Sequence, residues 1–101
     1  MRMSSRSLPA RQFELIAKAL ADPRRMALLE AIASERECPC RSLRERFPVS
    51  KGTISHHIKE LVNAGLIEAR REGQFLQCEV RRGTLEAYAA ELLRRTRARR
   101  H

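Results

Sequence analysis

The stretch from Val49 to Phe75, VSKGTISHHIKELVNAGLIEARREGQF, contains the signals for one helix followed by one hairpin. Ser50 is suited to cap a helix, because its hydroxyl can accept a hydrogen bond from an unpaired backbone N–H. Gly65 is suited to end that helix in a left-handed conformation. The residues expected on the packed face are Ile54, Ile58, Leu61 and Val62. We therefore expect an amphipathic helix between Ser50 and Gly65.

The residues after this helix predict a two-stranded hairpin. An extended segment begins at Leu66-Ile67 and turns near Glu72-Gly73-Gln74. In the returning strand, apolar and polar residues alternate, with Leu76, Cys78 and Val80 on one side and Gln77 and Glu79 on the other. Arg70 and Arg71 lie near the tip, so the hairpin is expected to carry a basic end.

The outward face of the expected helix is short, polar and free of an acidic cluster, which favours insertion into the major groove of DNA. Thr53, Ser55 and His56 are suited to contact base edges, while Lys51 and Lys59 are suited to meet phosphates. The hairpin arginines are placed to reach an adjacent backbone or minor groove. The candidate DNA-binding residues are Ser50, Lys51, Thr53, Ser55, His56, Lys59, Arg70 and Arg71.

The string SKGTISHHIKELVNAGLIEARREGQ closely resembles the recognition helix and wing of ArsR/SmtB-type winged helix-turn-helix repressors. The resemblance extends more loosely over residues 11 to 93, and LADPRRMALLEAI resembles the second helix of that family. It implies a homodimeric, sequence-specific DNA-binding regulator, most simply a repressor that occludes a promoter. The alternatives are a regulator of this fold with no metal response, or a protein- or RNA-interaction module that uses the fold.

The other helices can be placed from their own signals. A first helix should begin near Ala10, and Asp22-Pro23 should start a second, with Asp22 as its cap. A third is expected from about Pro39 to Phe47. A last helix from about Leu85 has an apolar face with nothing after it to cover it. The expected fold is therefore mainly α, with a small β-hairpin wing between the fourth and fifth helices.

The expected domain organisation is a flexible arm (residues 1–9), one winged helix-turn-helix DNA-binding and dimerisation domain (10–93) and a basic tail (94–101). The first and last helices form the natural dimer surface, as the family resemblance also implies. The tail is free of acidic residues and is expected to add nonspecific attraction to phosphates.

Composition supports a nucleic-acid partner. The chain has 101 residues and a formal net charge of +9, which indicates an anionic partner. One Tyr, three Phe and no Trp favour duplex DNA over single strands bound by base stacking. No apolar run approaches the roughly 20 residues of a membrane span, and the N-terminus lacks the apolar core of a signal peptide. With three cysteines, an odd number, we expect reduced thiols and a cytoplasmic protein.

Catalysis and zinc binding are not favoured. His56 and His57 follow Ser55, but no third partner and no glycine-rich oxyanion loop accompany them, so we do not expect an enzyme. The zinc site of some family members uses histidines on the last helix. This chain has Glu86 and Tyr88 there and no histidine before His101, so the imidazole ligands are absent.

Cys38-Pro39-Cys40 leaves two interpretations open. Family sensors of arsenic, antimony, lead or cadmium carry Cys-x-Cys at the start of the third helix, and soft thiolates bind such ions. Here Cys38 and Cys40 lie one residue earlier than that motif. The alternative interpretation is that Cys38 caps the helix and Cys40 is a packing residue. At a helix start beside Arg36 and Arg41, we expect lowered thiol pKa values. The possible effector is As(III), Sb(III), another soft ion or an oxidant; no cofactor is required. Cys78 is expected in the core.

Overall fold

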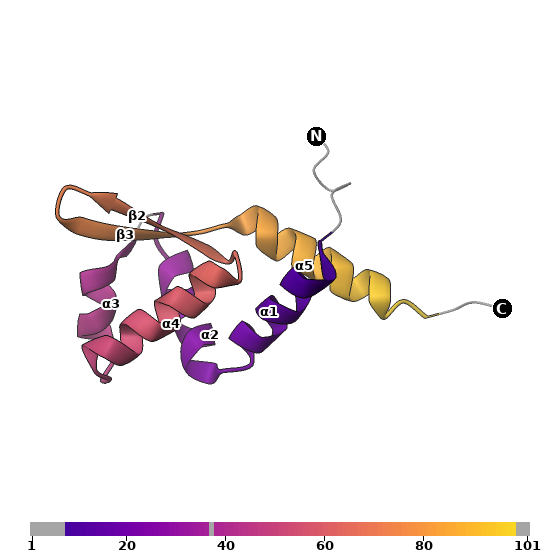
Figure 1. Ribbon diagram of the computed structural model, residues 1–101, viewed down its shortest axis with the longest axis horizontal. Coiled ribbons are helices and arrows are strands. Elements are labelled where there is room, and N and C mark those ends of the chain that lie inside the picture. Colours follow the sequence, from indigo (N-terminus) through magenta and orange to yellow (C-terminus); the bar gives the residue numbers. More distant parts are fainter. Residues whose placement is uncertain (1–7, 37, 99–101) are drawn as a thin grey trace.

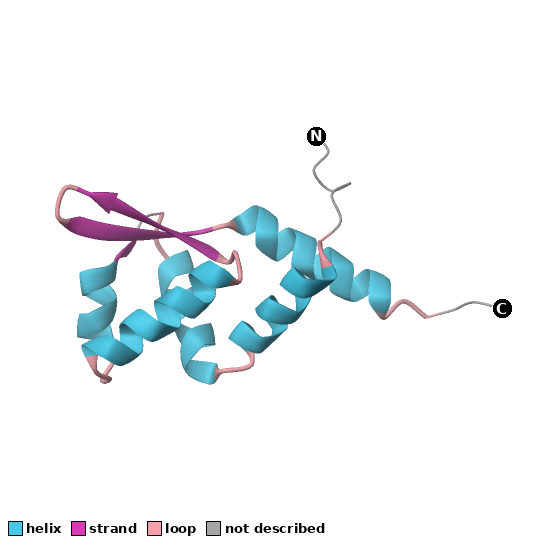
Figure 2. Ribbon diagram, viewed as in Figure 1, coloured by secondary structure: helices cyan, strands magenta, loops and turns pink. Residues whose placement is uncertain are grey.

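The computed structural model describes residues 8–36 and 38–98 and has the predicted architecture of five helices and a hairpin (Figure 1). The elements in chain order are α1 (Ala10–Leu20), α2 (Pro23–Ala33), β1 (Cys38–Pro39), α3 (Cys40–Arg46), α4 (Lys51–Asn63), β2 (Ile67–Glu72), β3 (Phe75–Val80) and α5 (Arg82–Arg95). Figure 2 shows the hairpin at one end of the helical body and α5 extending toward the other end. The fold is mainly α with a β-hairpin wing, as predicted.

The sheet contains one strand that the sequence did not predict. β2 and β3 pair antiparallel, from Ile67 opposite Val80 to Glu72 opposite Phe75, around the expected turn at Gly73 (φ +64°). The two-residue β1 adds to the other edge of β3 and places Cys38 opposite Cys78. Cys38 is therefore a strand residue and not the helix cap considered above. The cap position of α3 is held by Pro39, in an extended conformation.

The core lies between α2, α4 and the inner face of the sheet. The residues that are at most 2% exposed include Ile16, Leu28, Ile32, Leu43, Ile54, Leu61, Leu66 and Ile67. On α4 the buried stripe also contains His57 and Ile58. Val62 was predicted to pack but is 37% exposed, because it lies at the edge of this stripe. The other face of α4 is thus left to solvent.

The two chain ends differ from the expected boundaries. α5 begins at Arg82, before the predicted start near Leu85, and it continues through Arg94 and Arg95, which were assigned to the tail. Both arginines bind the Glu91 carboxylate, at 2.6 and 2.8 Å, and hold the pKa of Glu91 at about 2. At the other end, part of the expected arm is ordered, because Leu8 packs on the core and Pro9 precedes α1. Residues 1–7 and 99–101 lie outside the described residues.

Candidate nucleic-acid interface

The N-terminus of α4 is fixed by the predicted cap. Ser50 Oγ accepts a hydrogen bond from the Thr53 backbone N–H at 3.2 Å, and the two hydroxyl oxygens lie 2.9 Å apart. A serine cap of this kind contributes roughly 1 kcal/mol to helix stability. Because Thr53 is half-buried and its hydroxyl contacts Ser50, these two predicted DNA contacts act in the structure as one hydrogen-bonded unit.

The exposed side of α4 carries the other predicted contacts of this helix. Lys51, Ser55, His56 and Lys59 are all exposed to solvent. Lysine offers a positive charge to phosphates, while hydroxyl and imidazole groups can exchange hydrogen bonds with base edges. The structure therefore brings these four side chains onto one solvent-facing surface, with no acidic residue in the first turn.

The C-terminus of α4 is fixed by its backbone and by α1. Gly65 has φ +80°, its N–H donates to the Val62 carbonyl at 2.9 Å, and the Leu66 N–H donates to the Leu61 carbonyl at 3.0 Å. This is a Schellman motif, and it confirms the helix end predicted at Gly65. From α1, Gln12 Nε2 donates to the carbonyl of Ala64 at 3.1 Å. No local pattern in the sequence predicts this hydrogen bond.

The inner face of α4 is held by a buried histidine. His57 is 6% exposed, and its Nδ1 lies 3.5 Å from Arg25 Nη1 of α2. Arg25 also donates from Nε to the Ala19 carbonyl at 3.0 Å, so it connects α1, α2 and α4. Burial lowers the pKa of His57, against the opposing effect of Asp22. His57 therefore packs beneath α4, and no pattern in the sequence predicts its contact with Arg25.

The two wing arginines lie in different surroundings. Arg71 is exposed. Arg70 is half-buried and forms ion pairs with Glu72 at 3.6 Å and Glu79 at 3.7 Å. The hairpin register explains this, because Arg70 is opposite Gln77 and therefore diagonal to Glu79 on the outer face of the sheet. A phosphate would have to compete with two carboxylates for Arg70.

Helix α3 adds cations beside α4. Arg41, Arg44 and Arg46 are exposed, while Leu43 is fully buried. Arg46 pairs with Glu35 at 3.5 Å, and the Arg41 guanidinium lies 5.2 Å from the centre of the Phe75 ring on the wing. The start of α3 is thus in contact with the turn end of the hairpin.

The three cysteines are all buried and reduced, and they gather where β1, α3 and β3 meet. The Cys38 sulfur faces the carbonyl oxygen of Pro39 at 3.8 Å, and burial raises the pKa of this thiol, contrary to the lowered value expected. The Cys40 sulfur lies 3.0 Å from the sulfur of Cys78. Within the described residues, no group of three His, Cys, Asp or Glu side chains could hold a metal ion.

Comparison with known proteins agrees with this geometry. A family model described as a helix-turn-helix domain matches residues 20–70. The arsenical resistance operon repressor of Staphylococcus xylosus is 36% identical over 63 residues, which are 62% of this chain and 60% of the relative. The HTH-type transcriptional regulator YceK of Bacillus subtilis is 32% identical over 74 residues, 72% of this chain and 74% of the relative. The chain belongs to the ArsR/SmtB-type helix-turn-helix regulators.

Solved structures of ArsR-type regulators share the fold. An ArsR-like transcriptional regulator from Rhodococcus sp. RHA1 aligns with a TM-score of 0.76 and 26% identity, over 83% of this chain and 78% of that chain. The chain spans about three fifths of the length of the arsenical resistance repressors that it matches. Every helix in the described part of this ArsR-type chain is too short or too polar to cross a membrane.

Proposed function

We propose that this ArsR-type protein is a homodimeric, sequence-specific DNA-binding transcription regulator, and most simply a repressor that blocks a promoter. The exposed face of α4 supports this most directly, because it presents lysine, hydroxyl and imidazole groups on a helix that is fixed at both ends and along its inner face. An α-helix fits the major groove of B-DNA. Relatives named as repressors support the same function.

The contacts divide by chemistry. Ser55 and His56 read base edges, and Thr53 joins them when its hydroxyl leaves Ser50. Phosphates are met by Lys51, Lys59 and Arg71, with the Ser50 cap at the N-terminus of α4. Arg70 contributes less, because its charge is already balanced within the wing.

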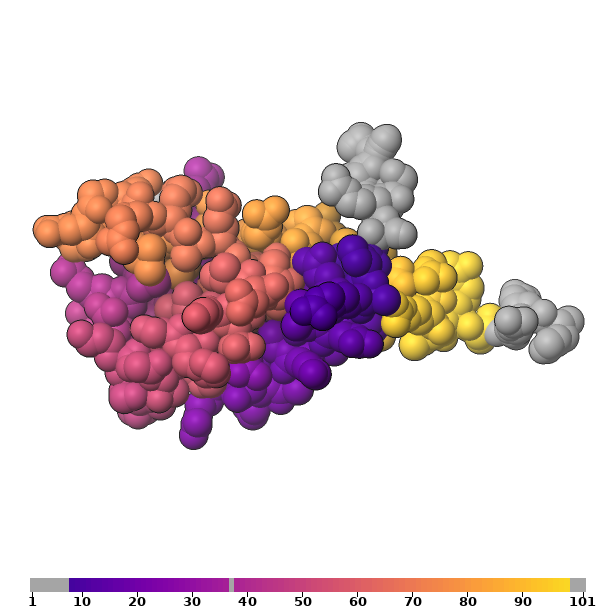
Figure 3. Space-filling view, in the orientation of Figure 1, coloured from indigo at the N-terminus to yellow at the C-terminus, as the bar shows by residue number. Residues whose placement is uncertain are grey.

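The dimer forms through α1 and α5. Leu92 and Leu93 near the end of α5 are 41% and 69% exposed, a large apolar surface for a small chain. Figure 3 shows this end of α5 projecting beyond α1. Phe13 of α1 and Tyr88 of α5 pack with ring centres 4.9 Å apart, so the two helices offer one continuous surface. Such a dimer reads two half-sites about one helical turn, ~10 bp, apart.

The test is binding of the full chain to a duplex from its own upstream region, at low salt, with an unrelated duplex of equal length as the matched control. We expect preference for the upstream duplex, competition by DNA but not by structured RNA, and scattering that gives the mass of a dimer. No binding, or a monomer, would reject the proposal. Stronger competition by RNA would favour the interaction-module alternative.

The arsenical resistance relatives support a second proposal, that As(III) or Sb(III) acts on the thiols and releases DNA. As placed, Cys38 and Cys40 do not fit a chelating pair, because the Cys38 sulfur is fully buried against the Pro39 carbonyl. Titration of the reduced protein with arsenite and antimonite tests the proposal. Weaker operator binding that Cys38→Ser with Cys40→Ser removes would support it, and unchanged affinity would reject it.

A further inference from the structure

A thiol pair that is invisible in the sequence joins α3 to the wing. Cys40 is the first residue of α3 and Cys78 lies within β3, 38 residues later, yet their sulfur atoms are 3.0 Å apart. The pairing of β1 with β3 explains the approach, since it holds Cys38 opposite Cys78 and so brings the start of α3 against β3. A disulfide bond is about 2.05 Å long, so the sulfurs need to close by roughly 1 Å.

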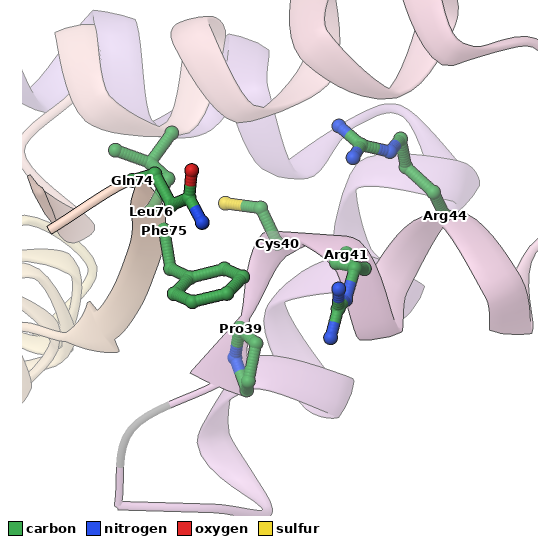
Figure 4. A pocket seen from close by; sticks show the side chains of 7 residues that line it. All are labelled: Pro39, Cys40, Arg41, Arg44, Gln74, Phe75 and Leu76. Atoms are coloured by element: carbon green, nitrogen blue, oxygen red, sulfur yellow. The ribbon is translucent and has the colours of Figure 1, made fainter. Parts of the chain in front are cut away.

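Of these two residues, Cys40 is the one that lines a pocket open to solvent. Cys40 lines an open pocket of about 280 Å³, together with Pro39, Arg41, Arg44, Gln74, Phe75 and Leu76. Figure 4 shows its sulfur directed toward the side where Gln74 and Leu76 lie. Cys40 is 6% exposed and Cys78 is 0% exposed. A small reagent that enters this pocket therefore meets Cys40 first.

The protonation of the pair supports the same order of reaction. The hydrogen bond from the Cys78 thiol lowers the pKa of Cys40, and the positive charge of Arg44 acts in the same direction against the cost of burial. The same contact and burial raise the pKa of Cys78. Because a thiolate is the nucleophile in thiol chemistry, Cys40 is the attacking residue and Cys78 is the residue that resolves.

We propose that Cys40 and Cys78 form a redox site in which a peroxide converts the two thiols into one intramolecular disulfide. The Cys40 thiolate attacks one oxygen of hydrogen peroxide and the O–O bond breaks. Cys40 becomes a sulfenic acid, and the hydroxide that leaves takes a proton from solvent to form water. The Cys78 sulfur then bonds to the Cys40 sulfur, and the second oxygen leaves as water with the Cys78 proton. Two electrons from the sulfurs reduce one peroxide to two waters.

The disulfide links α3 to the wing. Cys78 is the register partner of Ala69 in β2, and Ala69 directly precedes the two wing arginines. Drawing α3 and β3 together shifts these arginines relative to α4. On the basis of the proposed function, the oxidised protein binds its operator more weakly, by about fivefold or more, which is a usual size for coupling between sites.

The site is tested on the full chain, reduced and then freed of reductant, with hydrogen peroxide as the oxidant. Intact mass should fall by two hydrogens, free thiols should fall from three to one, and peptide mapping should join Cys40 to Cys78. Cys38→Ala is the matched control and should still form this bond, whereas Cys40→Ser and Cys78→Ala should not. Thermal melting of each variant checks folding, and Cys40→Ser at the pocket suffices if Cys78→Ala fails to fold.

A disulfide that contains Cys38, a bond between two chains, or three thiols left intact in the folded protein would overturn the site. Operator binding before and after oxidation tests the coupling separately. If oxidised and reduced forms bind equally, the coupling is overturned while the site stands. If the reduced form does not bind the operator, the proposed function fails, and the mapped disulfide still decides the redox site.

Discussion

Helix α4 and the wing both carry basic residues that the sequence assigns to DNA, yet the two regions hold their charge differently. Lys51 and Lys59 on α4 are exposed, and in the described part of the chain neither forms an ion pair. Arg70 on the wing lies between Glu72 and Glu79. The difference teaches that a basic residue in the sequence is an available cation only where the fold keeps carboxylates away from it.

The backbone geometry of each region explains the contrast. On α4 the helical period separates a buried stripe from a polar face, and hydrogen bonds hold both ends of the helix in place. On the hairpin, alternation places Glu68, Arg70 and Glu72 on one side of β2, beside Glu79 of β3. Exposed ion pairs of this kind are worth only about 0–1 kcal/mol each. They reduce the gain from a phosphate contact without preventing it.

Replacing both lysines of α4 should give the largest loss of DNA affinity. Each phosphate contact contributes roughly 0.9 to the slope of log affinity against log salt concentration, so Lys51→Ala with Lys59→Ala should lower that slope by about 1.8. At 0.1–0.2 M salt we expect a loss of roughly tenfold or more. The measurement is a salt titration of duplex binding. An unchanged slope would remove the contrast between α4 and the wing.

His56→Ala should reduce the preference for the operator over an unrelated duplex more than it reduces the overall affinity for DNA. A side chain that contacts a base edge gives roughly 1–3 kcal/mol of discrimination against the wrong base, so binding to the operator should approach binding to an unrelated duplex. The affinity ratio of the two duplexes measures this. Equal weakening on both duplexes would show that His56 meets phosphate, and Lys59→Ala, expected to weaken both alike, is the control.

Much of the fold, and of the geometry of α4 and the wing, could be predicted from local sequence signals. The cap at Ser50, the helix end at Gly65 and the turn at Gly73 depend on residues adjacent in the chain, and all three are as expected. The contacts that were missed join distant segments: Gln12 with Ala64, and Cys40 with Cys78. No periodicity contains such pairs, because they follow from how the helices and strands pack.

Contacts between residues that are not adjacent in the chain also explain the wrong predictions in the wing and at the chain end. Arg70 and Arg71 are adjacent and looked equivalent in the sequence, but the β3 register gives Arg70 a carboxylate from another strand. Arg94 and Arg95 looked like a free tail, but one helical turn brings both onto Glu91.

The two wing arginines should differ in a smaller but measurable way. Arg71→Ala should lower the salt slope by roughly 0.9. Arg70→Ala should lower it by less, because Glu72 and Glu79 already balance the charge of Arg70 before DNA binds. Parallel salt titrations of the two variants measure this. A larger slope change for Arg70→Ala would mean that DNA displaces Glu72 and Glu79 from it.

The support beneath α4 should appear as a pH effect on stability, the smallest effect expected. Burial keeps the pKa of His57 below the ordinary value of a histidine despite Asp22, with Arg24, Arg25 and His56 acting in the same direction as burial. As pH falls below 6.5, the unfolded chain takes up a proton before the folded chain does, so the free energy of unfolding decreases.

Urea unfolding at a series of pH values between about 7.5 and 5 measures this dependence. His57→Gln should flatten the decrease, and His56→Gln, at an exposed position on the same helix, should change it much less. A decrease that persists in His57→Gln would assign the pH dependence to other groups.

The most direct test of the central claim, that the polar face of α4 reads DNA, is to follow backbone amide NMR signals of the full chain during titration with its operator duplex. We expect the largest changes from Lys51 to Lys59, smaller ones around Arg71 and Gly73, and little change along the exposed end of α5. Changes concentrated in α5, with α4 unaffected, would contradict this assignment of the DNA-binding surface.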